Sequence, residues 1–64
     1  MQPEEKLLNV KETGVMLGIK TKTVYQLVHE RRIPYVKLFG KSLRFKLSDL
    51  QRIVDESTTP VQEF

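Results

Sequence analysis

Read from the N-terminus, the alternation of apolar and polar positions first predicts a short helix that starts after Asn9. Asn is a favoured N-cap residue, and Glu12 stands three residues later, where its carboxylate can reach back to the cap amide. Gly18 suits the left-handed residue that ends a helix. The residues expected to face inward are Val10, Gly14, Met16 and Leu17. A helix of about two turns is too short to persist alone, so it must dock on the rest of the chain.

A second helix is predicted from about Thr21, where apolar residues repeat at the i, i+3 and i+4 spacing of one buried face. These residues are Val24, Leu27 and Val28. A polar stripe on a different side of the helix is formed by Lys22, Gln26 and His29. Pro34 is expected to stop this helix and to make the residue before it extended. The link between the two helices, residues 18–20, has the spacing of a helix-turn-helix.

Beyond Pro34 the pattern changes to alternation, which is typical of a two-stranded ribbon. Gly40 can supply the positive φ angle that a tight hairpin turn needs. The apolar residues that alternate along the two strands are Val36, Leu38, Leu43 and Phe45, and the basic residues between them are Lys37 and Arg44. We therefore expect one face of the hairpin to be apolar and to rest on the helices, with the other face positive and directed outward.

The third helix is predicted to begin with a capping box, because Ser48 is followed three residues later by Gln51. Its buried positions are expected to be Leu50, Ile53 and Val54. Residues 1–6 and 57–64 are polar and show no periodicity, and we expect both to be flexible tails. The fold class expected for residues 7–56 is mostly α with a small β-hairpin: a winged helix-turn-helix with a two-stranded wing and a C-terminal helix.

Composition excludes several classes of protein. A chain of 64 residues forms one small domain that buries only about 60% of its unfolded surface, which leaves no wall for a substrate cavity. With no Cys and a single His, disulfides, zinc–thiolate sites and a histidine metal cage are excluded. Since no catalytic arrangement or glycine-rich phosphate loop is present, we expect no enzyme activity and no cofactor. No stretch approaches the ~20 apolar residues of a membrane span or resembles a signal peptide, so we expect a cytoplasmic protein with no membrane partner.

The charges are divided unevenly along the chain. Residues 20–46 hold eight Lys and Arg against one acid, Glu30, which gives this segment a net charge of +7. The remainder holds three basic residues against seven acids, and the whole chain has a net charge of +3. Such asymmetry is typical of a protein that binds a polyanion. The alternative is an uneven surface whose only effect is solubility.

The polar start of the second helix contains residue types that read DNA bases. A major groove about 12 Å wide accepts one α-helix, and side chains near the helix start reach the base edges. Lys22 can donate to guanine O6 and N7, and Gln26 can pair with adenine N6 and N7. The candidate contacts on this helix are Lys20, Thr21, Lys22, Thr23, Tyr25, Gln26 and His29. Two alternatives stay open: Tyr25 can pack against the hairpin, and His29 can simply face solvent.

The hairpin provides a second group of candidate DNA contacts. Lys41, Ser42 and Arg44 lie at or near its turn, and a narrow minor groove attracts inserted Arg. The alternative is that these charges keep a sheet edge from pairing with other chains. Further candidate phosphate contacts are Arg31, Arg32, Lys37 and Lys46. For the two arginines the alternative is stabilisation of the helix C-terminus.

Six short motifs follow one another along the chain: Leu8-Asn9-Val10-Lys11-Glu12, Leu17-Gly18-Ile19, Thr23-Val24-Tyr25-Gln26-Leu27, Ile33-Pro34, Gly40-Lys41-Ser42-Leu43-Arg44-Phe45 and Ser48-Asp49-Leu50. Their order resembles the excisionase-type, MerR-like winged helix-turn-helix family over about residues 7–54. The resemblance implies that double-stranded DNA is the partner and that the helix at residues 21–29 enters the major groove. It also implies that the wing at residues 40–42 reaches the adjacent minor groove or backbone, with Arg44 a frequent contact.

Four positions depart from the family pattern. Gly14 stands where Ala is usual, which loosens the first helix by about 1 kcal/mol. Lys20 replaces a Ser-like cap, which leaves Thr21 as the alternative cap of the second helix. Arg31 occupies a position often held by Gly, where a left-handed Arg would be strained. Phe39 is one extra residue ahead of the wing glycine.

The biological role and the partners stay open between several alternatives. The family includes small phage or mobile-element excisionases and related transcription regulators, so an excisionase-like or architectural factor and a small regulator are both expected candidates, in the nucleoid of a bacterial or phage-infected cell. Because one module makes an interface of about 600–1,000 Å², strong specificity would need further copies of the protein on DNA or an integrase or other recombinase as partner. A protein-interaction adaptor that docks through Tyr35 and Phe39 is the alternative from another class.

Overall fold

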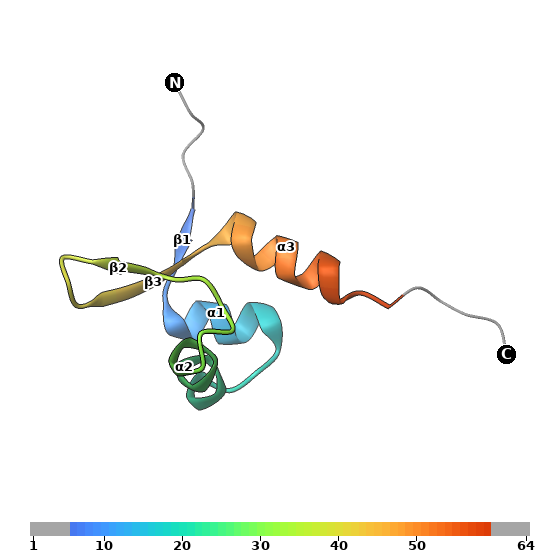
Figure 1. The fold of residues 1–64 in the computed structure, drawn as a ribbon, viewed down its shortest axis with the longest axis horizontal. Coiled ribbons are helices and arrows are strands. Elements are labelled where there is room, and N and C mark those ends of the chain that lie inside the picture. Colours follow the sequence, from blue (N-terminus) through green and yellow to red (C-terminus); the bar gives the residue numbers. More distant parts are fainter. Residues whose placement is uncertain (1–5, 60–64) are drawn as a thin grey trace, which may run out of the picture.

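Six elements follow one another in residues 6–59, the part of the chain that the computed structural model describes. They are β1 (Leu7–Leu8), α1 (Val10–Leu17), α2 (Thr21–His29), β2 (Val36–Leu38), β3 (Ser42–Lys46) and α3 (Leu47–Ser57). The strands form one antiparallel sheet in the order β1-β3-β2, and the β2–β3 hairpin projects from the body as a wing (Figure 1). The fold is the expected winged helix-turn-helix, with three helices and a sheet of three strands. Most of the two expected flexible tails lies outside the described residues.

The two ends of α1 confirm the predicted helix boundaries. The Asn9 side-chain oxygen accepts a hydrogen bond from the Glu12 amide (2.7 Å), and the Glu12 carboxylate accepts one from the Asn9 amide (3.0 Å). This reciprocal pair is the predicted capping box. At the other end Gly18 is left-handed (φ 70°), and the Ile19 amide donates to the Gly14 carbonyl oxygen (2.9 Å). The Gly18 amide also donates to the Val15 carbonyl oxygen (3.3 Å). The two bonds form a Schellman motif, which starts the turn toward α2.

The inward face of α1 differs from the prediction at two positions. Met16 is exposed, whereas Thr13 is fully buried. The i, i+3 and i+4 spacing that starts at Val10 selects Thr13 and Gly14 for burial, and Met16 lies to the side of this stripe. A Cβ atom on Gly14 would lie 2.8 Å from the Ile19 carbonyl oxygen. Glycine therefore permits a close approach between α1 and the link to α2.

α2 begins at Thr21 as predicted, but its ends differ in detail. Lys20 is the N-cap residue, so the alternative that Thr21 caps the helix is wrong. The helix ends at His29, well before Pro34, so the proline does not stop it. Arg31 ends the helix, because it adopts the left-handed conformation (φ 58°). Glycine often holds this position in the family that the sequence resembles, and a left-handed Arg here was expected to be strained.

β1 is a strand that the sequence did not predict. It pairs with the end of β3, where Leu8 lies opposite Phe45. The amide of Leu47 donates to the carbonyl oxygen of Lys6 (2.9 Å), so Lys6 takes part in the fold although it was expected to belong to a tail. A strand of two residues is too short for an alternating pattern to reveal it.

The pairing of β2 with β3 mixes apolar and basic side chains on each face of the wing. Val36 lies opposite Arg44, and Lys37 lies opposite Leu43. Because directly opposed residues of an antiparallel pair project from the same face, each face combines an apolar with a basic side chain. The prediction of one apolar and one basic face is therefore wrong. Residues 39–41 separate the paired strands, and this odd number shifts the register by one relative to a two-residue turn.

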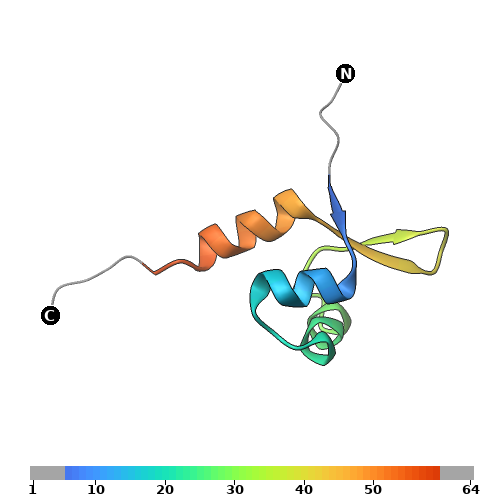
Figure 2. The same cartoon turned by 180° about the vertical axis from the view of Figure 1, so that it is seen from behind.

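α3 follows β3 without a loop, and it leads away from the α1–α2 pair (Figures 1 and 2). It begins at Leu47 with Lys46 as its N-cap residue, so the predicted capping box at Ser48 does not start the helix. Leu50 is fully buried as predicted, but Val54 is 44% exposed. The first turns of α3 therefore hold it against the sheet, and burial decreases toward its C-terminal end.

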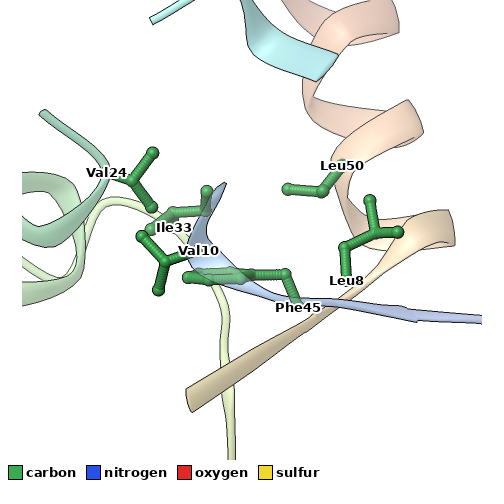
Figure 3. Packing of buried hydrophobic residues seen from close by; sticks show 6 residues of the cluster. All are labelled: Leu8, Val10, Val24, Ile33, Phe45 and Leu50. Atoms are coloured by element: carbon green, nitrogen blue, oxygen red, sulfur yellow. The ribbon is translucent and has the colours of Figure 1, made fainter. Parts of the chain in front are cut away.

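The hydrophobic core lies where the sheet meets all three helices (Figure 3). Its buried residues are Leu8, Val10, Val24, Ile33, Phe45 and Leu50. Phe45 of β3 lies centrally, with Val10 and Ile33 toward one end of its side chain and Leu8 toward the other. Burying a side chain of this size stabilises a fold by about 1.5–3 kcal/mol. Because Val24 is buried in the same core, the polar side of α2 is fixed outward.

Candidate nucleic-acid interface

α2 presents most of the predicted base-reading residues to solvent. The exposed ones are Lys20, Thr21, Lys22, Tyr25, Gln26 and His29. Thr23 is half-buried beside the fully buried Val24, so it is less accessible than its neighbours. Val24 faces the core, which leaves Lys22 and Gln26 on an outward face where a helix can enter a groove.

The one acidic residue of the basic segment lies at the end of this face. The Gln26 side-chain amide donates to the Glu30 carboxylate (3.1 Å), and a guanidinium nitrogen of Arg32 lies 3.7 Å from the same carboxylate. Both contacts are at the surface, where each contributes at most about 1 kcal/mol. A base can therefore displace Glu30 from Gln26 at small cost, while Arg32 continues to offset its charge.

The N-terminus of α2 is open toward solvent. Lys20 adopts an extended backbone (φ −74°, ψ 152°) and its side chain makes no capping hydrogen bond. The first amides of a helix have no partner within it and carry the positive end of the helix dipole. Together with Lys20 and Lys22, these amides form a positive surface at the start of the helix, which favours an anion such as a phosphate.

A hollow of about 490 Å³ lies beside α2, and we call it the α2–wing hollow. It is lined by Asn9, Val10, Lys11, Tyr25, Val28, Tyr35, Lys37, Lys41, Leu43 and Arg44. Its basic residues come from the start of α1, from β2, from the wing turn and from β3, and none of the lining residues is acidic. Concave surfaces that carry one sign of charge concentrate the electrostatic potential, so this hollow attracts an anionic partner.

Tyr25 connects the outer face of α2 with this hollow. Its side chain is 54% exposed, and the residue borders the hollow together with residues of the wing. The two alternatives for Tyr25, packing on the hairpin and contact with a phosphate, are therefore compatible. The aromatic ring can lie along the wing while the hydroxyl group faces solvent.

The wing residues differ in how freely they can reach a ligand. Lys37 and Lys41 are exposed, and Ser42 is half-buried. Arg44 is half-buried, and its guanidinium donates to the Leu43 carbonyl oxygen (2.8 Å). Arg44 thus borders the α2–wing hollow in a held position, whereas the two lysines can move toward a phosphate.

The remaining candidate phosphate contacts lie away from the α2–wing hollow. Lys46 is exposed and lies at the far end of β3, opposite Leu7, and it is not among the residues that line the hollow. Arg31 and Arg32 border a second hollow of about 560 Å³, which also involves Ile33, Pro34 and Tyr35. The structure therefore brings together the hollow residues and separates Lys46 from them.

Sequence reasoning missed Lys11 and Asn9 as parts of this surface. Both lie at the start of α1, outside the basic segment, and both line the α2–wing hollow. The predicted capping box placed the helix start at Asn9, but no pattern along the chain shows that this start faces the wing. Only the antiparallel pairing of the strands brings these elements together.

Residues 6–59 contain no group of three or more His, Cys, Asp or Glu residues arranged to hold a metal ion. They also contain no helix with the length and apolar character that a membrane crossing requires.

The fold is that of a helix-turn-helix protein, a class that typically binds DNA. A family model described as a helix-turn-helix domain matches residues 7–58, and the chain belongs to this family. Comparison with curated proteins and with solved structures gives no match. The match covers every helix and strand described above, so the class rests on the whole fold and not on one motif.

Proposed function

We propose that this protein binds double-stranded DNA, with α2 in the major groove and the wing on the adjacent backbone or minor groove. The observation that carries the proposal is the α2–wing hollow, where basic side chains from several elements meet beside Tyr25 and Val28 of α2. Phosphate contacts supply most of the affinity of such proteins, and they fix the register in which a helix meets the bases.

The residues divide into two proposed roles. Lys22 and Gln26 would read base edges, since both are exposed on the outward face of α2. Exposed or hollow-lining residues would hold the backbone: Lys11, Lys20, Thr21, Tyr25, Lys37, Lys41 and Arg44. Thr23, His29, Ser42, Arg31 and Arg32 would lie at the edge of the interface. Lys46 would lie outside it.

An excisionase-like or architectural factor and a small transcription regulator are both consistent with this proposal. The resemblance to the excisionase-type, MerR-like pattern supports this pair of roles. One module of this size covers about 600–1,000 Å² of DNA, so several copies or a recombinase partner would add the specificity that a single copy lacks.

The salt dependence of DNA binding tests the proposal. Fluorescence anisotropy with a labelled short duplex of mixed sequence measures the dissociation constant at several salt concentrations. Neutralising about five phosphates gives a log–log slope near −4.5. A slope near zero, or no binding at low salt, would contradict the proposal that the protein binds DNA.

A matched pair of lysine variants makes the test specific for the α2–wing hollow. Lys41→Ala is expected to reduce the magnitude of the slope by about 1, because it removes one phosphate contact. Lys46→Ala changes the same residue type in the same hairpin, but at the far end of β3 and outside the residues that line the hollow, and is expected to leave the slope unchanged. Equal effects of the two variants would show that net charge, and not this surface, controls binding.

A protein-interaction adaptor is the second candidate, supported by two exposed aromatic residues. Tyr35 is 47% exposed and Phe39 is 91% exposed. Between them on β2 lies the exposed, basic Lys37, so the aromatic residues do not form a continuous apolar patch. This interruption favours the DNA proposal over the adaptor.

A further inference from the structure

The tip of the wing exposes the ring of Phe39 more fully than the structure exposes any other large apolar side chain in residues 6–59. Phe39 is 91% exposed, and its backbone is left-handed (φ 54°). A bulky residue is rare in that region of conformational space, because its Cβ approaches the following carbonyl oxygen. Glycine or asparagine would adopt the same turn with less strain. The ring therefore adds nothing to the core, and its backbone is strained, which together indicate a role outside the fold.

The wing carries this ring in a short and regular turn. The Lys41 amide donates to the Leu38 carbonyl oxygen (3.0 Å), and Gly40 follows with φ 72°. Positive φ angles at both central positions are the feature of the tight turns that match the twist of a hairpin. Figure 1 shows that the wing extends away from the helices, with the turn at its far end.

Basic residues flank the ring on both sides in the sequence. Lys37 lies on β2 and Lys41 is the last residue of the turn, and both line the α2–wing hollow. A surface that docks a protein through an aromatic anchor surrounds that anchor with further contacts that exclude water. Phe39 instead has an exposed lysine two residues away on each side in the chain, and proteins that insert an apolar wedge into the minor groove also use basic side chains in that groove.

We propose that Phe39 is a wedge that inserts between base pairs in the minor groove and kinks the DNA beside the α2 contact. This inference rests on the proposed DNA-binding function and deepens it, since it assigns DNA bending and a preference for deformable steps to one side chain. Inserted apolar side chains unstack a base step and bend the duplex by roughly 20–90°. Pyrimidine–purine steps such as TA open most easily, so the wing would favour sites that contain one.

The variant Phe39→Asn removes the proposed wedge and keeps a turn that the fold accepts. The substitution creates an Asn-Gly turn, which suits the left-handed backbone, and is expected to raise the melting temperature by about 4 °C. The same variant is expected to lose the bend and roughly 5-fold in affinity for a duplex with a central TA step, with an unchanged salt slope. A residue that only supports the fold could not raise stability and lower bending together. Phe39→Leu keeps an apolar wedge and should retain most of the bend.

Energy transfer between dyes at the two ends of a short duplex measures the bend, and anisotropy on the same duplex measures affinity. If the wild type and Phe39→Asn bind with the same salt slope and bend the duplex equally, the wedge proposal is wrong and the DNA-binding proposal stands. If the wild type itself shows no salt-dependent binding, the proposed DNA-binding function is wrong, and the wedge that rests on it is wrong as well. An unchanged bend together with loss of a protein partner in Phe39→Asn would also overturn the wedge and support the adaptor.

Discussion

Gly14→Ala tests the closest approach in the helix-turn-helix. Helix propensity alone predicts that this change stabilises α1 by about 1 kcal/mol, since Gly is a poor helix former and Ala the best. The structure predicts the opposite. The new Cβ would lie 2.8 Å from the Ile19 carbonyl oxygen and 3.6 Å from a methyl carbon of Val24. The first distance is too short for a carbon–oxygen contact.

The magnitude follows from what would have to move. Ile19 lies in the link between α1 and α2, and its amide already donates to the Gly14 carbonyl oxygen (2.9 Å). Its carbonyl group can turn away only if the peptide that joins Ile19 to Lys20, the N-cap residue of α2, changes its orientation as well. Forcing an extra carbon into such a contact costs about 1–3 kcal/mol. After the gain in propensity, we expect the free energy of unfolding to fall by about 1 kcal/mol, or the melting temperature by about 4–8 °C.

Thermal and urea unfolding followed by circular dichroism measure this change. Val15→Ala is the matched control, because it introduces Ala at the next position of the same helix, where the side chain is 78% exposed. It is expected to raise the free energy of unfolding by a few tenths of a kcal/mol, roughly its gain in propensity. If Gly14→Ala is more stable than the wild type by about 1 kcal/mol, the close approach of α1 to the link is refuted.

Three further changes test other features of the fold. Arg31→Gly should raise the free energy of unfolding by about 1 kcal/mol in urea unfolding, because glycine relieves the left-handed strain at φ 58°, whereas Arg31→Ala keeps the strain and should give no gain. Thr13→Val should raise it by about 1 kcal/mol, since the buried Oγ1 has no hydrogen-bond partner among the described residues; a loss of stability would show that this hydroxyl is paired. Leu50→Ala should lower the melting temperature strongly, with a cost of about 2–5 kcal/mol, while Val54→Ala on the exposed side of α3 should stay within about 0.5 kcal/mol; similar costs for both would contradict the burial that the structure shows.

The parts of the fold that sequence predicted are those decided by neighbouring residues. The capping box at Asn9 and Glu12 and the left-handed Gly18 depend on a few consecutive positions, and all three are confirmed. The left-handed conformation of Arg31 was suggested by the family pattern, in which glycine often holds this position. Local backbone geometry of this kind can be inferred from residue type without knowledge of the tertiary fold.

The parts that sequence missed depend on pairing between distant segments. Alternation in the wing fixes a period of two but not the register, and the extra turn residue changes which side chains share a face. β1 forms because Leu8 pairs with Phe45, which lies far away in the sequence. For the same reason, α3 starts at Leu47, at the end of a paired strand, and not at the polar cap that its own sequence suggests.

The candidate site shows the same division. The excess of positive charge in residues 20–46 indicated a basic surface, and the exposed residues of α2 agree with the predicted polar stripe. The contribution of Lys11 and the separation of Lys46 were not visible, because both follow from strand pairing and from the packing of α1 beside the wing.

The central claim is that α2 and the wing form one DNA-binding surface, and an NMR titration tests it most directly. Proton–nitrogen spectra are recorded while a short duplex of mixed sequence is added at low and at high salt. The account predicts shifts in residues 20–29, at Lys11 and around the wing turn, that weaken together at high salt, while α3 beyond Leu50 stays unchanged. Shifts that spread evenly over all basic residues, Lys46 included, or the absence of salt-sensitive shifts on α2 would contradict it.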